Sequence, residues 1–146
     1  MSSLPHYAKG EVIKGFGRGS KELGIPTANY PEDVVNNLPE NFAKGIYCGF
    51  ASVDNGAVHK MVISIGWNPT YGNTTKSMET HIMNMNEGDF YGKELKIVIL
   101  NYIRDEVKFT TIEALIETIH SDIKYADEEL NKPEYEKYRS DNFFKA

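Results

Sequence analysis

The segment Lys14–Asn29 (KGFGRGSKELGIPTAN) combines alternating glycines with cationic side chains, a composition that could bind phosphate. Its spacing fits neither of the two common phosphate loops. A Walker A loop requires Gly-Lys followed by Ser or Thr, whereas Ser20 precedes Lys21 here, and a dinucleotide fingerprint requires G-x-G-x-x-G at the start of a helix. The cations Lys14, Arg18 and Lys21 could still attract a small anion such as a nucleotide. Any phosphate site in this segment is therefore built in a different way.

The end of the same segment, Pro26-Thr27-Ala28-Asn29, offers neutral oxygen ligands. In an extended chain Thr27 and Asn29 project to the same side. Such oxygens suit a hard cation like Mg²⁺, which keeps phosphates and waters as its other ligands. The alternative is that the four residues only close a turn, and on the motif alone the turn is favoured.

A second group of polar residues lies in the stretch SMETHIMN. Strand alternation places Glu79 and His81 on one face together with Met83 and Met85, and places on the other face Met78, Thr80, Ile82 and Asn84. A carboxylate that shares a face with methionines can be partly desolvated, as a general base should be. An exposed polar face at the start of a strand is an equal alternative. A metal site at Glu79 and His81 lacks a third ligand at usable spacing.

Two further residues could contact a ligand. Trp67, beside Gly, Asn and Pro, could cover a ligand, although such a tryptophan more often anchors a loop on the core. Arg104 follows an apolar strand and could meet an anionic ligand, or pair with Asp105 or Glu106 in solvent. Each signal is weak when taken alone.

The elements that must position these residues are mostly strands. Gly45–Val53 leads through Asp54-Asn55-Gly56 into Val58–Gly66, and Asn-Gly between two such runs predicts a hairpin. Met78–Asn84 and Glu94–Ile103 continue the strand pattern, while 67–77 and 86–93 have the Gly, Asn and Pro of loops. The first strand is expected to begin near Gly10.

One helix is predicted after the last strand. Thr110 and Glu113 form a capping box, and helical spacing is kept by Ile112, Leu115, Ile116, Ile119 and Ile123. Pro133 either closes that segment or opens a short second helix. A short helical turn is expected between 31 and 44. The pattern predicts one mainly β domain over residues 1–146, a small antiparallel β-barrel with its helix at the C-terminal end.

The composition limits the function classes. The chain has 146 residues, is 40% hydrophobic, and carries 16 Lys and Arg against 21 Asp and Glu, for a net charge of −5. This acidic balance disfavours nucleic acid or an anionic membrane as the main partner. Cys48 is the only cysteine, which excludes an internal disulfide and is typical of a reducing compartment. We therefore expect a cytoplasmic protein, with no membrane-spanning segment.

The motifs GFGRGSKELGIPTAN, GIYCGFASV, SIGWNPTYGN, SMETHI, DFYG and R-x-E-x-x-F, taken in order, resemble riboflavin kinase of the eukaryotic, single-function type. The resemblance extends from about Gly10 to the tail Asp141–Phe144. It implies a six-stranded antiparallel barrel with a C-terminal helix, and transfer of the ATP γ-phosphate to the riboflavin 5′-hydroxyl to give FMN. In bacteria this domain is commonly fused behind an adenylyltransferase, and the residues before Gly10 leave that second activity no place in this chain.

The resemblance also implies roles for individual residues. Glu79 would be the base that faces the 5′-hydroxyl, and Thr27 and Asn29 would hold Mg²⁺ on the phosphates, with Zn²⁺ or Mn²⁺ as alternative ions. The implied ATP contacts are Gly15, Gly17, Lys21, Ile82, Asn84 and Tyr91, and the implied flavin contacts are Arg104, Val107, Phe109 and Ala114. The chain departs from the family where Arg104-Asp105-Glu106 replaces Arg-Pro-Glu, which adds a negative charge near a flavin phosphate.

Two other function classes can be compared with a kinase. A non-catalytic flavin-binding module on the same barrel would not need Thr27, Asn29 and Glu79 to be intact. A small-barrel nucleic-acid binder would need a basic stripe with interleaved aromatic residues, which the sequence lacks. We therefore expect a monomeric enzyme whose partners are riboflavin or FMN and ATP or ADP.

Overall fold

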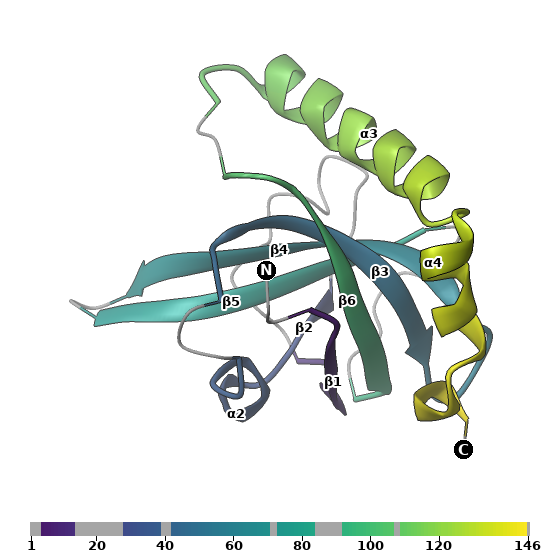
Figure 1. Cartoon of the computed structure of the whole chain (residues 1–146). Helices are drawn as coiled ribbons and strands as arrows, with labels where there is room; N and C mark the ends of the chain where they lie inside the picture. The colour runs from purple at the N-terminus through teal and green to yellow at the C-terminus, as the bar shows by residue number, and fades with distance from the viewer. Residues whose placement is uncertain are drawn as a thin grey trace.

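The computed structural model of the chain describes residues 4–13, 28–38, 42–70, 73–83, 92–106 and 109–145, and the side chains of 67–77 are not described. Six strands and one long helix make up most of it (Figure 1). In chain order the elements are β1 (His6–Glu11), β2 (Ala28–Asn29), α2 (Glu32–Val35), β3 (Gly45–Val53), β4 (His59–Thr70), β5 (Asn73–Ile82), β6 (Glu94–Arg104), α3 (Ile112–Glu129), α4 (Pro133–Glu136), and the 3₁₀ turns Lys137–Ser140 and Asn142–Phe144.

The strands form one antiparallel sheet in the order β1-β6-β3-β4-β5-β2, and the sheet curls strongly (Figure 1). Ile13, just after β1, forms an isolated bridge with Asn29 of β2, in which the Ile13 N–H donates to the Asn29 carbonyl at 2.9 Å. This bridge joins the first strand of the order to the last. The predicted mainly β fold, a six-stranded antiparallel sheet of barrel type with a C-terminal helix, is confirmed.

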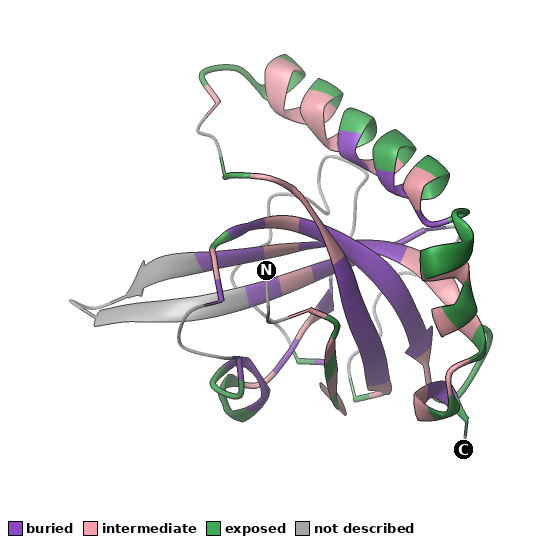
Figure 2. Cartoon of the chain, viewed as in Figure 1, coloured by how far each residue is buried: buried purple, intermediate pink, exposed green. Residues whose placement is uncertain are grey.

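Each central strand contributes side chains to two hydrophobic clusters, one on each face of the sheet. Because successive strand residues point to opposite faces, β3 alternates between the two clusters. Tyr47 points inward and Phe50 outward, and Figure 2 shows the middle of the sheet buried along its length. The inner cluster is built around Tyr47, Met61, Ile63, Ile65, Met78, Leu95, Ile97 and Ile99, and the outer cluster around Cys48, Phe50, Val62, Met83, Val98, Leu100, Ala126 and Leu130.

Helix α3 covers the outer cluster with its C-terminal half. Ala126 and Leu130 are buried there, whereas Ile112 in the first turn is 61% exposed, and the start of the helix stands away from the sheet (Figure 1). The N-cap is Thr111, whose side chain accepts a hydrogen bond from the Ala114 N–H at 3.1 Å. The predicted cap at Thr110 is therefore wrong by one residue, because Thr111 is the residue with extended backbone before the helix. Pro133 opens α4.

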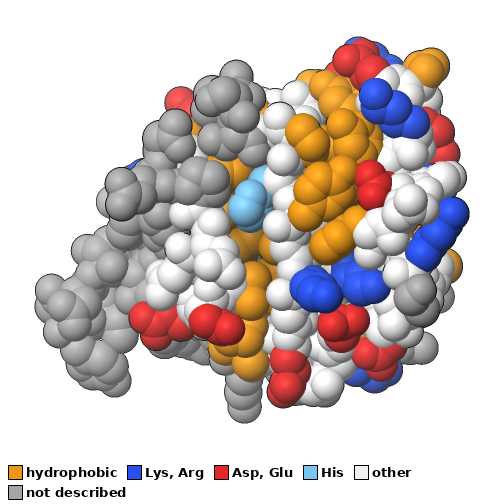
Figure 3. Space-filling view, turned by 60° about the horizontal axis from the view of Figure 1, so that its bottom comes forward, with side chains coloured by type: hydrophobic (Ala, Val, Ile, Leu, Met, Phe, Trp, Pro, Cys, Tyr) orange, Lys and Arg blue, Asp and Glu red, His pale blue; other side chains and the backbone are white. Residues whose placement is uncertain are grey.

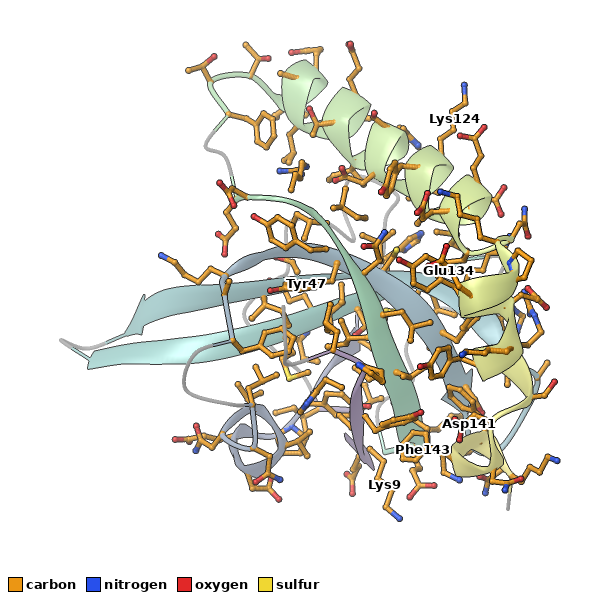
Figure 4. All side chains as sticks on the ribbon, viewed as in Figure 1. Lys9, Tyr47, Lys124, Glu134, Asp141 and Phe143 are labelled. Carbon is orange, nitrogen blue, oxygen red and sulfur yellow. The ribbon has the colours of Figure 1, made fainter. Side chains whose placement is uncertain are left out.

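The C-terminal tail packs against β1. The Tyr7 hydroxyl donates to the Asp141 carboxylate at 2.8 Å, and the Tyr7 and Phe143 rings meet edge to face at 5.0 Å. Figure 4 shows Asp141 and Phe143 at the same end of the sheet as Lys9 of β1. The last residues of the chain therefore lie against its first strand and fix the end of the outer cluster.

The predicted β3–β4 hairpin is confirmed, with positive φ at Asp54 and Asn55 and with Gly56 completing the turn. Two other predictions about strands need correction. Residues 67–70 and 73–77, expected in a loop, extend β4 and β5, because backbone pairing continues to Thr70–Asn73 despite weak strand propensity. β1 begins at His6, ahead of the expected start near Gly10, because its pairing with β6 starts there.

Candidate active site

Glu79 lies within β5 and has a neighbour across the sheet on each side. It is paired with Ser64 of β4 and with Asn29 of β2. Residues directly opposite each other in antiparallel strands project to the same face, with Cβ atoms about 4.5–5.5 Å apart. Ser64, Glu79 and Asn29 are all half-buried and stand side by side. We call these three residues the polar row.

The polar row lies on the outer face of the sheet, the face that carries α3. Met78 and Ile82, at alternate positions of β5, belong to the inner cluster, whereas Met83 belongs to the outer one. Glu79 and His81 therefore face outward. The predicted alternation is confirmed from Met78 to Met83, whereas Asn84 and Met85 lie outside the described residues.

The segment that contains the alternating glycines is anchored at the polar row. Residues 14–27 lie outside the described structure, but the residues before and after them are described. Ile13 pairs with Asn29, and Ala28 pairs with Thr80 next to Glu79. The described residues on either side of this segment therefore lie next to the polar row. The sequence predictions for Gly15, Gly17, Lys21 and Thr27 fall in this segment and stay predictions.

Arg104, at the end of β6, is held by α3 through a two-point ion pair. Its Nε donates to Asp122 Oδ1 at 2.9 Å and its Nη2 donates to Asp122 Oδ2 at 2.8 Å. Its Nη1 donates to the Asp105 carbonyl at 2.9 Å. The Asp122 side chain is 7% exposed and that of Arg104 is 24% exposed. Arg104 of β6 is paired with Ile46 of β3, and Ile46 is paired with Ser64 of β4. Arg104 therefore lies in the same line of residues across the sheet as the polar row.

Asp122 was not identified from the sequence, although the signal was present. It lies three residues after Ile119 and four before Ala126, on the stripe that faces the sheet. A buried carboxylate requires a charged or hydrogen-bonding partner, and this requirement points to a cation on a facing strand. The structure pairs Arg104 with this helix carboxylate rather than with the carboxylates of Asp105 or Glu106, the solvent alternative considered from sequence.

Glu106 lies just beyond β6 and reaches over β4. Its Oε1 is 2.6 Å from the point where a Cβ would stand at Gly66. Gly66 is two residues from Ser64 along β4, so it faces the same side as the polar row. The lack of a side chain at Gly66 thus leaves the space that the Glu106 carboxylate occupies.

The other predicted contact residues are not tied to the polar row by a pairing or contact among those described above. Phe109 lies just before α3 and Ala114 lies in its first turn, and both are half-buried. Ile82 is 5% exposed in the inner cluster, on the face away from Glu79. Asn84, Tyr91 and Val107 lie outside the described residues. The side chain of Trp67 is also not described, so both interpretations of this residue stay open.

The electrostatic setting of the sheet is mixed. On the face seen in Figure 3, basic and acidic side chains lie next to each other.

Burial raises the pKa of the Cys48 thiol to about 12, so this thiol is protonated at neutral pH and is a poor nucleophile. Within the described ranges, no three His, Cys, Asp or Glu side chains gather as a metal site, and no helix is long and apolar enough to span a membrane.

A family model and full-length relatives place this chain in one family. Residues 2–130 match the family model described as Flavokinase: Riboflavin kinase. Human riboflavin kinase is 56% identical over 146 residues, which is 100% of this chain and 94% of the human protein. A bifunctional riboflavin kinase/FMN phosphatase of Arabidopsis thaliana is 45% identical over 95% of this chain and 37% of its own length. The crystal structure of riboflavin kinase from Trypanosoma brucei superposes with a TM-score of 0.75 and 26% identity, covering 94% of this chain and 87% of that one.

Proposed function

This chain belongs to the riboflavin kinase family, and we propose that its reaction takes place at the polar row, on the outer face of the sheet. The chain is an enzyme that phosphorylates riboflavin to FMN, and ATP is the co-substrate that the family uses. One observation carries the location of the site. Glu79, the expected base, is directly opposite Asn29, an expected metal ligand, although the two residues are far apart in sequence.

The chemistry requires positioning and charge neutralisation more than covalent participation by the protein. The riboflavin 5′-oxygen forms a bond to the γ-phosphorus of ATP, and the bond from that phosphorus to the oxygen bridging the β-phosphate breaks, which releases ADP. Glu79 accepts the hydroxyl proton as the attacking oxygen becomes acidic. The described residues on either side of the glycine-containing segment pair next to the polar row, Ile13 with Asn29 and Ala28 with Thr80. We propose that the backbone N–H groups of this segment bind the ATP phosphates.

The residues present fit a hard cation. Asn29 offers a neutral amide oxygen on the same face as Glu79, and Thr27 would add a hydroxyl. Oxygen donors of this kind match Mg²⁺, which prefers phosphate and water as its remaining ligands. When bound, Mg²⁺ neutralises charge on the transferring phosphate. Asn29 would thus hold the ion on the side of the sheet where Glu79 faces the hydroxyl proton.

The remaining parts of the proposal concern the whole protein. We infer a single kinase domain that acts as a monomer in the cytoplasm, with no nucleic-acid or membrane partner. The support is the acidic net charge of −5 and the single, buried cysteine. Sedimentation of the purified protein at micromolar concentration tests the oligomeric state, and retention on heparin tests the charge argument.

The activity is tested by incubating the protein with riboflavin, ATP and Mg²⁺ and separating FMN by chromatography. Asn29→Ala should raise the Mg²⁺ concentration needed for half-maximal rate. Asn37→Ala, a change of an exposed asparagine after α2, is the matched control and should behave like wild type. An unchanged Mg²⁺ response in Asn29→Ala would remove the metal role, whereas no FMN from the wild-type protein would contradict the assigned activity itself.

A further inference from the structure

The carboxylate of Glu106 occupies a defined place on the sheet. Its Oε1 and Oε2 lie 2.6 and 3.5 Å from the position that a Cβ would take at Gly66. Any side chain at residue 66 would therefore displace the carboxylate. At Gly66, one position of the outer face is thus filled by a charged group from the segment that follows β6.

This position is one step along β4 from the polar row. Gly66 is two positions after Ser64, with one residue between them, which is about 7 Å along a strand. Ser64 is directly opposite Glu79. A molecule whose reacting hydroxyl is at Glu79 and which extends along β4 would therefore pass next to Glu106.

The backbone just before Glu106 is attached to α3 through Arg104. Arg104 Nη1 donates to the Asp105 carbonyl, and the same guanidinium is paired at two points with the buried Asp122. The chain is thus attached to α3 immediately before Glu106 turns over β4.

We propose that Glu106 is a substrate-binding residue that accepts hydrogen bonds from the ribityl hydroxyls of riboflavin, between the reacting 5′ end and the ring. This inference rests on the proposed function of the polar row. A carboxylate has two oxygens with about four acceptor sites, which suits adjacent hydroxyl donors. Its negative charge repels phosphate, so the ATP phosphates lie elsewhere and the polyol is the group that this position favours.

The test compares the binding of two flavins to the full chain by quenching of flavin fluorescence. Lumiflavin has the riboflavin ring system but a methyl group in place of the ribityl chain. Glu106→Gln should raise the Kd for riboflavin roughly 10-fold or more, the usual effect of losing a charged hydrogen-bond acceptor. The Kd for lumiflavin should stay within twofold of wild type.

Gly66→Ala supplies a second, independent perturbation. It leaves the charge of Glu106 intact but places a Cβ where the carboxylate lies, so it should weaken riboflavin binding in the same direction. The double variant should bind no more weakly than Glu106→Gln alone. Glu32→Gln is the matched control, because it makes the same change at an exposed glutamate of α2, and it should bind both flavins like wild type.

Three results would overturn the proposal. They are an unchanged riboflavin Kd in Glu106→Gln, an equal loss for riboflavin and lumiflavin, and a shifted Mg²⁺ dependence of turnover with riboflavin binding unchanged. The last result would assign Glu106 to the metal instead. Thermal unfolding of each variant identifies one that does not fold, and the other variant then decides. Failure of the wild-type protein to bind riboflavin would instead contradict the proposed function.

Discussion

The Arg104–Asp122 ion pair connects the end of β6 to α3, and Asp122→Asn is expected to weaken both stability and riboflavin binding. Breaking a fully buried pair by removing one partner costs about 3–5 kcal/mol. The Asp122 side chain is 7% exposed, but that of Arg104 is 24% exposed and can recover some hydration. Asparagine also keeps one acceptor for Arg104 Nε. We therefore expect a loss of about 2 kcal/mol, which for a domain of this size lowers Tm by roughly 6–10 °C.

The assay is a double-mutant cycle on thermal or urea unfolding. Asp122→Asn, Arg104→Met and the double variant are compared with wild type, and the coupling energy should exceed about 1 kcal/mol because the two side chains share two hydrogen bonds. The functional measurement is the KM for each substrate. Because Arg104 is an expected flavin contact, the KM for riboflavin should rise in Asp122→Asn while the KM for ATP stays close to wild type.

The control is the exposed pair of Glu136 and Arg139, whose side chains are 45% and 35% exposed. Glu136→Gln should change stability by less than about 0.5 kcal/mol, as surface ion pairs usually do. Additive effects of the Asp122 and Arg104 changes would refute the argument from burial. An equal rise in both KM values would refute the link between this pair and the flavin.

Three further predictions follow from individual contacts. Glu79→Gln should lower kcat by roughly 10²–10⁴-fold while riboflavin and ATP still bind, and near wild-type kcat would make His81 the next base to test. Lys60→Met should lower the free energy of unfolding in urea by about 1–3 kcal/mol at an unchanged m value. The reason is that Lys60 Nζ donates at 2.8 Å to both the carbonyl and the carboxylate of Asp127, at the C-terminal end of α3. An unchanged urea midpoint would contradict this prediction. Burial lowers the pKa of His6 below 6.5, so the unfolded chain binds the proton more readily than the folded one. Stability should therefore fall as the pH drops below about 6.5, and His6→Gln should reduce that fall. Identical pH profiles of stability for the two proteins would exclude His6 as its source.

The predictable part of the fold is the part governed by alternation. The strand Gly45–Val53 has the bounds predicted from sequence. Met78 of β5 points inward, and Met83, directly after β5, points outward, as the sequence pattern indicates. These results follow from a side-chain period of two that each strand carries in its own residues. A loop was expected at 67–77 because Asn, Pro and Gly reduce strand propensity locally. The pairing of β4 with β5 depends instead on the residues of both strands together.

The sequence supplies candidate residues for the site, and it does not supply their neighbours across the sheet. Ser64 appears in the sequence as one polar residue in an apolar strand, and only the register of β4 against β5 places it beside Glu79. From the sequence, Glu106 is a residue of the R-x-E-x-x-F motif and a possible solvent partner of Arg104. Its proximity to Gly66 is not predictable, because it depends on how β6 ends. Cross-strand proximity is a property of the register, and a single sequence does not specify the register between distant strands.

The register of β2 decides whether Asn29 can serve the site, and the core sets that register. A slip of one residue would turn Asn29 to the inner face. β2 has only two residues, so its own pairing is a weak constraint. The constraint comes from Tyr30, which is 4% exposed and whose hydroxyl donates to the Leu95 carbonyl at 2.6 Å, and from the Ile13 N–H bond to the Asn29 carbonyl. Tyr30 points away from the polar row, yet it holds the expected metal ligand opposite the expected base. The geometry of this site therefore depends on packing on the inner face as much as on the motif that identifies it.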